Sequence, residues 1–137
     1  MGRTAMQYHR RMLRFLVLGL LVACSSASYQ TVKMVNRTPR AIESIYVYPV
    51  GATSHGASRG NLAPGATVDV QVKEGNVEVL AVAAEEQLEG GQRERKQATQ
   101  ILELRAPLEL VFHDSNQAIV ERPGTIGVVF RVLPPPQ

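Results

Sequence analysis

Apolar and polar residues alternate along much of the chain beyond residue 30, with the period of two that is typical of a β-strand with one buried face. Residues 67–72 give the clearest example, because Val68, Val70 and Val72 share one face and polar side chains occupy the other. Residues 77–84 are apolar on both faces after Glu78, which predicts a central strand. Further strands are expected at residues 31–36, 42–48, 102–105, 108–113, 118–121 and 126–133.

Turn-forming residues separate these segments at intervals of roughly ten residues. Leu62-Ala63-Pro64-Gly65 fits a turn in which proline fixes φ and glycine tolerates positive φ, and residues 51–60 form a long glycine-rich loop. Short strands at this spacing predict an all-β fold: a single small β-sandwich of about seven or eight strands, immunoglobulin-like or transthyretin-like. A small closed barrel is the alternative.

The charged segment at residues 85–96 contains the pair Gly90-Gly91. If these glycines form the turn of a β-hairpin, opposite charges meet across the ladder. The facing pairs are then Glu89 with Gln92, Glu86 with Arg95, and Glu85 with Lys96. A helix is the alternative for residues 85–88 and 93–100, because both stretches contain good helix-forming residues.

The first 23 residues predict an export signal. Four arginines within the first 14 residues precede an apolar run at residues 15–23, which is the order found in secretory signal peptides. The run is too short to cross a bilayer, because a spanning helix takes about 20 apolar residues and Arg14 prevents extension toward the N-terminus. Residues 1–23 are therefore expected to be absent from the mature protein.

The end of this signal, Leu21-Val22-Ala23-Cys24, resembles the lipobox of bacterial lipoproteins. The resemblance implies that the Cys24 sulfur receives diacylglycerol, that cleavage precedes Cys24, and that the new amino terminus is acylated. Two or three acyl chains hold a protein on a bilayer almost permanently. The membrane is thus an expected partner, bound through the acyl chains on Cys24. An ordinary signal peptide, cut after Ala23 or a later alanine, is the alternative.

The lipoprotein resemblance implies a domain organisation and a location. Residues 1–23 are the signal peptide, 24–30 the lipidated cysteine and its tether, 31–133 the β-sandwich, and 134–137 a proline-rich tail. By the rule of that family, Ser25 in place of an aspartate implies the outer membrane. The mature part resembles small bacterial envelope β-sandwich domains, in which a Leu-x-Pro-Gly turn leads into a valine strand, as residues 62–72 do.

The charge of the chain is unevenly distributed. Of the 15 basic residues, four lie in the signal, which leaves 11 basic against 12 acidic residues in the mature part. A basic nucleic-acid-binding surface would need a marked excess of positive charge. Nucleic acid is therefore not an expected partner.

The residues that could carry chemistry are few. His55 and His113 are the histidines that follow the signal, and no His, Cys, Asp or Glu series has the spacing of a zinc site, so no metal and no cofactor are expected. The chain lacks a Gly-x-Ser-x-Gly motif, and acylated Cys24 could not act as a nucleophile, so no catalytic residue and no enzyme activity are expected. His113 is expected on the solvent side of its strand.

Four residues are candidates for contact with a partner: Tyr46, Tyr48, His55 and Arg59. The two tyrosines share one face of the strand at residues 42–48, where packing within the sandwich is the favoured interpretation and anchoring of a partner is the other. His55 and Arg59 lie in the glycine-rich loop, for which flexibility or partner contact is expected. The charged hairpin at residues 85–96 is a further candidate for docking.

Together these features predict a lipid-anchored, noncatalytic binding or assembly module at the outer membrane, facing the periplasm, with an envelope protein as its partner. Lipid anchoring would raise the effective concentration of weak contacts with a membrane complex. The alternatives are a periplasmic carrier of a small ligand, with a cavity between the sheets or under residues 51–60, and an inhibitor of an envelope enzyme.

Overall fold

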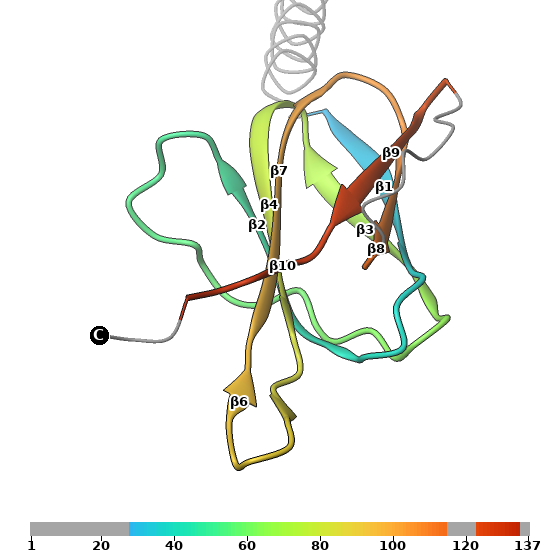
Figure 1. Cartoon of the computed structure of the whole chain (residues 1–137). Coiled ribbons are helices and arrows are strands. Elements are labelled where there is room, and N and C mark those ends of the chain that lie inside the picture. The colour runs from blue at the N-terminus through green and yellow to red at the C-terminus, as the bar shows by residue number, and fades with distance from the viewer. Residues whose placement is uncertain (1–27, 115–122, 135–137) are drawn as a thin grey trace, which may run out of the picture.

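A computed structural model describes residues 28–114 and 123–134 (Figure 1). These residues form ten β-strands and no helix. The strands of the first half are β1 (Tyr29–Asn36), β2 (Ile42–Pro49), β3 (Thr67–Lys73), β4 (Gly75–Ala83) and β5 (Glu86–Gln87). Those of the second half are β6 (Arg93–Glu94), β7 (Lys96–Leu104), β8 (Leu108–His113), β9 (Thr125–Val129) and β10 (Arg131–Val132). The predicted strand at residues 118–121 and the lipobox lie outside the described residues.

The strands form two four-stranded sheets and a short ribbon. The first sheet has the order β3-β1-β8-β9, the second β10-β7-β4-β2, and β5 pairs with β6. In the first sheet β1 is antiparallel to β3 but parallel to β8, and β8 is parallel to β9. The second sheet is antiparallel throughout. The all-β prediction is confirmed, and the arrangement of two sheets is sandwich-like.

The hydrophobic core lies between the two sheets. Because side chains alternate along a strand, each sheet turns one apolar row inward. Val32 and Met34 of β1 share one buried cluster with Val77 and Val79 of β4 and with Leu104 of β7. Burial of each such side chain stabilises the fold by about 1.5–3 kcal/mol. The central position predicted for residues 77–84 is confirmed, since β4 lies between β7 and β2.

The last strand segment differs from the sequence prediction. Residues 126–133 were expected to form one strand, but the chain changes sheet at Phe130, so that β9 belongs to the first sheet and β10 to the second. The backbone N–H of Phe130 donates to the carbonyl of His113 at 3.0 Å. The Phe130 ring is buried, and its centroid lies 5.8 Å from the centroid of the Phe112 ring. Burial of this aromatic side chain fixes the crossing point and places the following residues beside β7.

Buried Asn36 at the end of β1 organises the turn that follows. Its side-chain amide donates to the carbonyls of Arg40 and Leu62 at 2.9 and 3.1 Å. Its side-chain oxygen accepts from the backbone N–H and the hydroxyl of Thr38 at 3.0 and 2.7 Å. Buried polar groups are costly unless they are paired in this way. The network therefore fixes residues 37–40 against the chain that leads to β3.

The predicted hairpin is confirmed, and the helical alternative for residues 85–88 and 93–100 is wrong. Its register differs by one residue, because β5 and β6 pair Glu86 with Glu94 and Gln87 with Arg93. The N–H of Leu88 donates to the carbonyl of Gln92 at 2.7 Å, so the loop contains three residues instead of two. Both glycines of this loop have positive φ, 86° and 81°. The longer loop shifts every facing pair and brings two carboxylates together.

Arg40 compensates for these facing carboxylates. Its Nη2 atom donates to Glu86 and, at 3.0 Å, to Glu94. Lys96, which was expected to face Glu85, instead lies 3.8 Å from Glu94 and 3.5 Å from Asp114. The hairpin is thus tied to the sandwich by a cation from the turn after β1.

Candidate functional site

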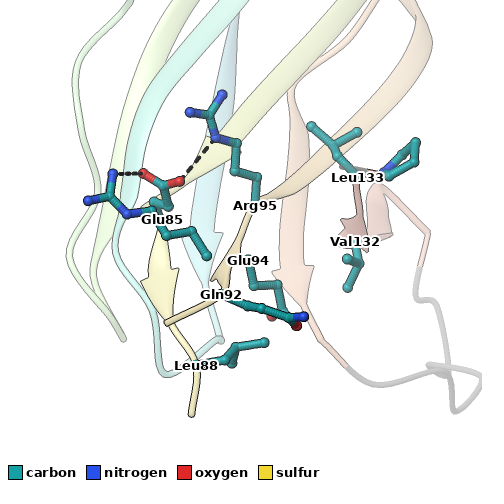
Figure 2. Close-up of a pocket in the computed structure, with 9 residues that line it drawn as sticks. Glu85, Leu88, Gln92, Glu94, Arg95, Val132 and Leu133 are labelled. Atoms are coloured by element: carbon teal, nitrogen blue, oxygen red, sulfur yellow. Dashed lines mark hydrogen bonds and ion pairs between the residues drawn. The ribbon is translucent and has the colours of Figure 1, made fainter. Parts of the chain in front are cut away.

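A groove of about 490 Å³ lies between the β5–β6 hairpin and residues 132–134 (Figure 2). We call it the hairpin groove. Its lining residues are Glu85, Leu88, Gln92, Arg93, Glu94, Arg95, Val132, Leu133 and Pro134. Because β10 exists only through the sheet change at Phe130, the groove depends on residues far apart in the sequence.

The floor of the hairpin groove is apolar. Val132 pairs with Lys96 in the ladder between β10 and β7, and the N–H of Leu133 donates to the carbonyl of Arg95 at 2.9 Å. Leu88, Val132 and Leu133 remain 40%, 57% and 37% exposed. Apolar side chains gathered in a concave surface and rimmed by polar residues are typical of interaction sites. Figure 2 shows these three side chains around one open space, with Gln92 beside them.

The rim of the hairpin groove carries both charges. Glu85 lies 3.3 Å from Nε of Arg95 and 3.8 Å from Arg93. Both arginine side chains are about two-thirds exposed, at 67% and 69%, so these pairs contribute little to stability, about 0.2–1 kcal/mol. Their guanidinium groups can therefore exchange Glu85 for a partner's acceptor at small cost.

The structure brings together three of the four sequence-predicted contact residues in a second place. The His55 ring stacks on the Tyr48 ring, with centroids 4.6 Å apart and planes 20° from parallel. The Tyr46 ring lies 5.9 Å from His55. Arg59, the fourth residue, lines a hollow of about 310 Å³ together with Tyr48. The glycine-rich loop therefore folds back on β2.

The two tyrosines lie on the outer face of the second sheet. Ile45 and Val47 alternate with them and turn toward the core, so Tyr46 and Tyr48 do not join the cluster between the sheets that the sequence favoured for them. Tyr48 is nevertheless buried, with His55 stacked on its ring. Burial, together with the hydrogen bond and the charge of Glu78, which faces it on β4, raises the pKa of Tyr48 to about 12. The phenol therefore keeps its proton and serves as a donor.

The loop also closes the exposed edge of β2. Arg59 N–H donates to the carbonyl of Ile45 at 2.7 Å, and the Ser58 hydroxyl accepts from the Ile45 N–H at 3.2 Å. Leu62 forms a bridge with Ile42 further along the same edge. Covering an edge strand protects it from pairing with another chain. The geometry gives residues 58–62 this structural task in addition to any contact with a partner.

The expectation for His113 is wrong. The His113 side chain was expected on the solvent side of its strand, but His113 is only 7% exposed. The reason is that β8 lies inside the first sheet between β1 and β9, with Val129 directly beside His113. Among the described residues, no group of three or more His, Cys, Asp or Glu side chains is placed to hold a metal ion.

Sequence reasoning missed the groove residues Leu88, Val132 and Leu133 and the role of Arg40. A signal existed for Leu88, because it is the one apolar side chain among the charged and glycine residues of 85–96. No signal existed for Val132 and Leu133, since the mainly apolar run at residues 126–133, which Arg131 interrupts, does not reveal a change of sheet. Arg40 was hidden because its partners lie 46 and 54 residues further along the chain.

Comparisons of this chain with protein-family models, with curated proteins and with solved structures find no match. Within the part of the chain that the structure describes, no helix is long and apolar enough to cross a membrane. Cys24 and the lipobox residues Leu21, Val22 and Ala23 lie outside that part.

Proposed function

We propose that this chain is a lipid-anchored envelope protein whose β-domain is a noncatalytic binding or assembly module at the outer membrane. Its anchor is acylated Cys24, and its partner surface is the hairpin groove. The observation that carries the proposal is the gathering of exposed Leu88, Val132 and Leu133 in one concave surface beneath exchangeable charges. An apolar centre with a polar rim is the usual composition of a protein–protein contact.

The nature of the groove favours a protein segment over a small molecule. Its walls come from a two-stranded ribbon and a short edge strand, so the space is only partly enclosed. A small-ligand site usually encloses most of its ligand. Carriage of a small ligand is the second candidate, and the hollow beside Tyr48 and Arg59 is the place that supports it. As part of the proposal, the sandwich belongs to the immunoglobulin-like or transthyretin-like class.

The test is chemical crosslinking in native membranes with three forms of the protein. The unmodified chain is expected to capture a defined envelope protein, and mass spectrometry of its mature N-terminus is expected to give acylated Cys24. Cys24→Ser, which removes the anchor, and Leu88→Asp, which places a charge on the groove floor, should each reduce capture at least tenfold. Leu88 is exposed, so its substitution should change stability by less than about 0.5 kcal/mol.

A matched substitution makes the test specific. Ile101→Asp introduces the same charge at another exposed apolar residue, which lies on the outer face of β7 and does not line the groove, and should leave capture unchanged. Equal loss of capture in both aspartate variants would contradict the groove as the partner surface. A mature N-terminus without acyl chains would contradict the anchor.

A further inference from the structure

A second group of exposed residues lies at the end of the sandwich where the described chain begins. The N–H of Glu74 donates to the carbonyl of Ser28 at 3.0 Å, and Tyr29 pairs with Lys73. The N–H of Val50 donates to the carbonyl of Asn76 at 3.0 Å, next to the same turn. We call this the tether end. The β5–β6 hairpin projects from the opposite end of the molecule (Figure 1).

The tether end combines apolar and cationic side chains. Tyr29 and Val50 are 58% and 49% exposed. Lys73 and Arg59 line one hollow, and among the described residues neither has a carboxylate within 4.0 Å. The carboxylate of nearby Glu74 accepts a hydrogen bond from Gln30. Tyrosine, an aliphatic residue and two unpaired cations are the side chains that suit the headgroup region of a bilayer.

The length of chain before Ser28 brings the tether end close to the anchor. β1 begins at Tyr29 rather than at the expected Thr31, so the tether is shorter than predicted from the sequence. Ser28 is four residues beyond Cys24, so the chain from one to the other spans at most about 14 Å when fully extended. Acyl chains on Cys24 would thus hold Ser28 within that distance of the lipid surface.

We infer that the tether end rests on the bilayer, with Tyr29 and Val50 among the lipid headgroups and with Lys73 and Arg59 on lipid phosphates. This inference rests on the proposed function, because it takes Cys24 to be acylated. The nine residues of β4 run from the tether end to the hairpin and extend about 30 Å. Contact at the tether end therefore points the hairpin groove away from the membrane, toward a partner in the periplasm.

The test uses the acylated full-length protein in vesicles made of equal parts of phosphatidylethanolamine and phosphatidylglycerol. Cys24 is the only cysteine of the chain, so after its acylation an introduced cysteine is the sole free thiol. A fluorophore on Val50→Cys should be quenched strongly by lipids that carry a nitroxide on the headgroup. The same fluorophore on Leu88→Cys, in the hairpin, should be quenched at least fivefold less.

A second pair of variants distinguishes contact between the tether end and the bilayer from the proximity that the tether alone would cause. Lys73→Gln with Arg59→Gln removes the two cations and leaves the tether unchanged. Each lost cation should lower about fivefold the population of protein whose tether end contacts the bilayer, and quenching at position 50 should fall accordingly. Arg93→Gln with Arg95→Gln makes the same change of charge at the hairpin groove and should have no effect on this quenching.

The outcomes distinguish the inference from the proposed function. Quenching at position 50 that is no stronger than at 88, or that survives loss of Lys73 and Arg59, would overturn the inference while leaving an acylated, vesicle-bound protein. A protein that carries no acyl chain and does not bind the vesicles would overturn both. Mass spectrometry of the N-terminus is therefore recorded on the same samples.

Discussion

At the scale of single residues, Asn36 is the side chain on which most of the turn structure depends. It is fully buried, and its side chain bonds the backbone of four other residues, Thr38, Arg40, Leu62 and Ala63. Asn36→Ala would leave the buried N–H of Thr38 without its acceptor, which costs about 1–3 kcal/mol, and would remove further bonds to the carbonyls of Arg40 and Leu62, which keep the Thr38 hydroxyl and the Ile42 N–H as donors. We expect urea unfolding to give a loss of about 2–4 kcal/mol. Asn61→Ala, at an exposed position nearby, should cost less than about 0.5 kcal/mol.

The phenol of Tyr48 predicts how stability depends on alkaline pH. Its pKa in the folded protein is about 12, above the ordinary value of 10.0, chiefly because of burial and also because of Glu78. The folded state thus holds this proton to higher pH than the unfolded state does. The contribution of Tyr48 to stability is fully present below pH 10 and is lost as the pH rises toward 12.

Tyr48→Phe tests this dependence, because phenylalanine keeps the ring on His55 and removes the ionisable group. Unfolding curves measured between pH 9 and pH 12 should fall less steeply for the variant than for the unmodified chain. Parallel curves for the two proteins would show that another group controls alkaline unfolding.

At the scale of elements, the hairpin owes its orientation to Arg40. The three-residue loop places Glu86 opposite Glu94, and like charges in facing positions destabilise a ladder. Arg40→Met would leave Glu86 and Glu94 facing each other with only Lys96, 3.8 Å from Glu94, as a nearby cation among the described residues. We expect a loss of hydrogen-exchange protection confined to residues 85–96, while the amides of β4 and β7 beyond the hairpin stay protected.

A compensating variant checks the cause. Glu94→Gln added to Arg40→Met removes the repulsion and should restore part of the hairpin's protection. Unchanged protection in Arg40→Met alone would mean that the hydrogen bond of Leu88 to Gln92 holds the hairpin without the charge network.

The elements were largely predictable from the sequence, whereas their neighbours were not. Alternation located the strands now seen at β3 and β8, because burial of one face dictates the residue pattern, and runs of strand-forming residues between turns located β1, β2 and β4. The register of the hairpin depended on loop length, and the glycine pair fits a loop of two or of three residues. The change of sheet at Phe130 and the burial of His113 depend on which strands lie beside β8 and β7. A residue pattern carries no information about that choice.

The same distinction applies to the candidate site, where some residues could be selected from the sequence but their contacts could not. Tyr46 and Tyr48 could be selected from the sequence because they are two aromatic residues on one face of a strand, and His55 because it lies in the glycine-rich loop. Their packing on the outer face could not, since it depends on the loop folding back through the N–H of Arg59. The hairpin groove required the sheet change at Phe130 and was therefore invisible in the sequence.

At the scale of the whole molecule, the exposed apolar residues fall mainly at two opposite ends. Of the six large exposed hydrophobic side chains among the described residues, three line the hairpin groove and two lie at the tether end. Ile101, on the outer face of β7, is the sixth. Such a bipolar surface suits a module that contacts lipid at one end and a protein at the other, as proposed above.

The central claim is that the hairpin groove is where a partner binds, and site-specific photocrosslinking in living cells tests it most directly. A photoreactive residue is placed at Leu88 or, as the control, at exposed Asp69 on the outer face of β3. We expect a crosslink to one defined envelope protein from position 88, none from position 69, and loss of the crosslink when Cys24→Ser removes the anchor. The same partner crosslinked from position 69, or no crosslink from position 88, would contradict the claim.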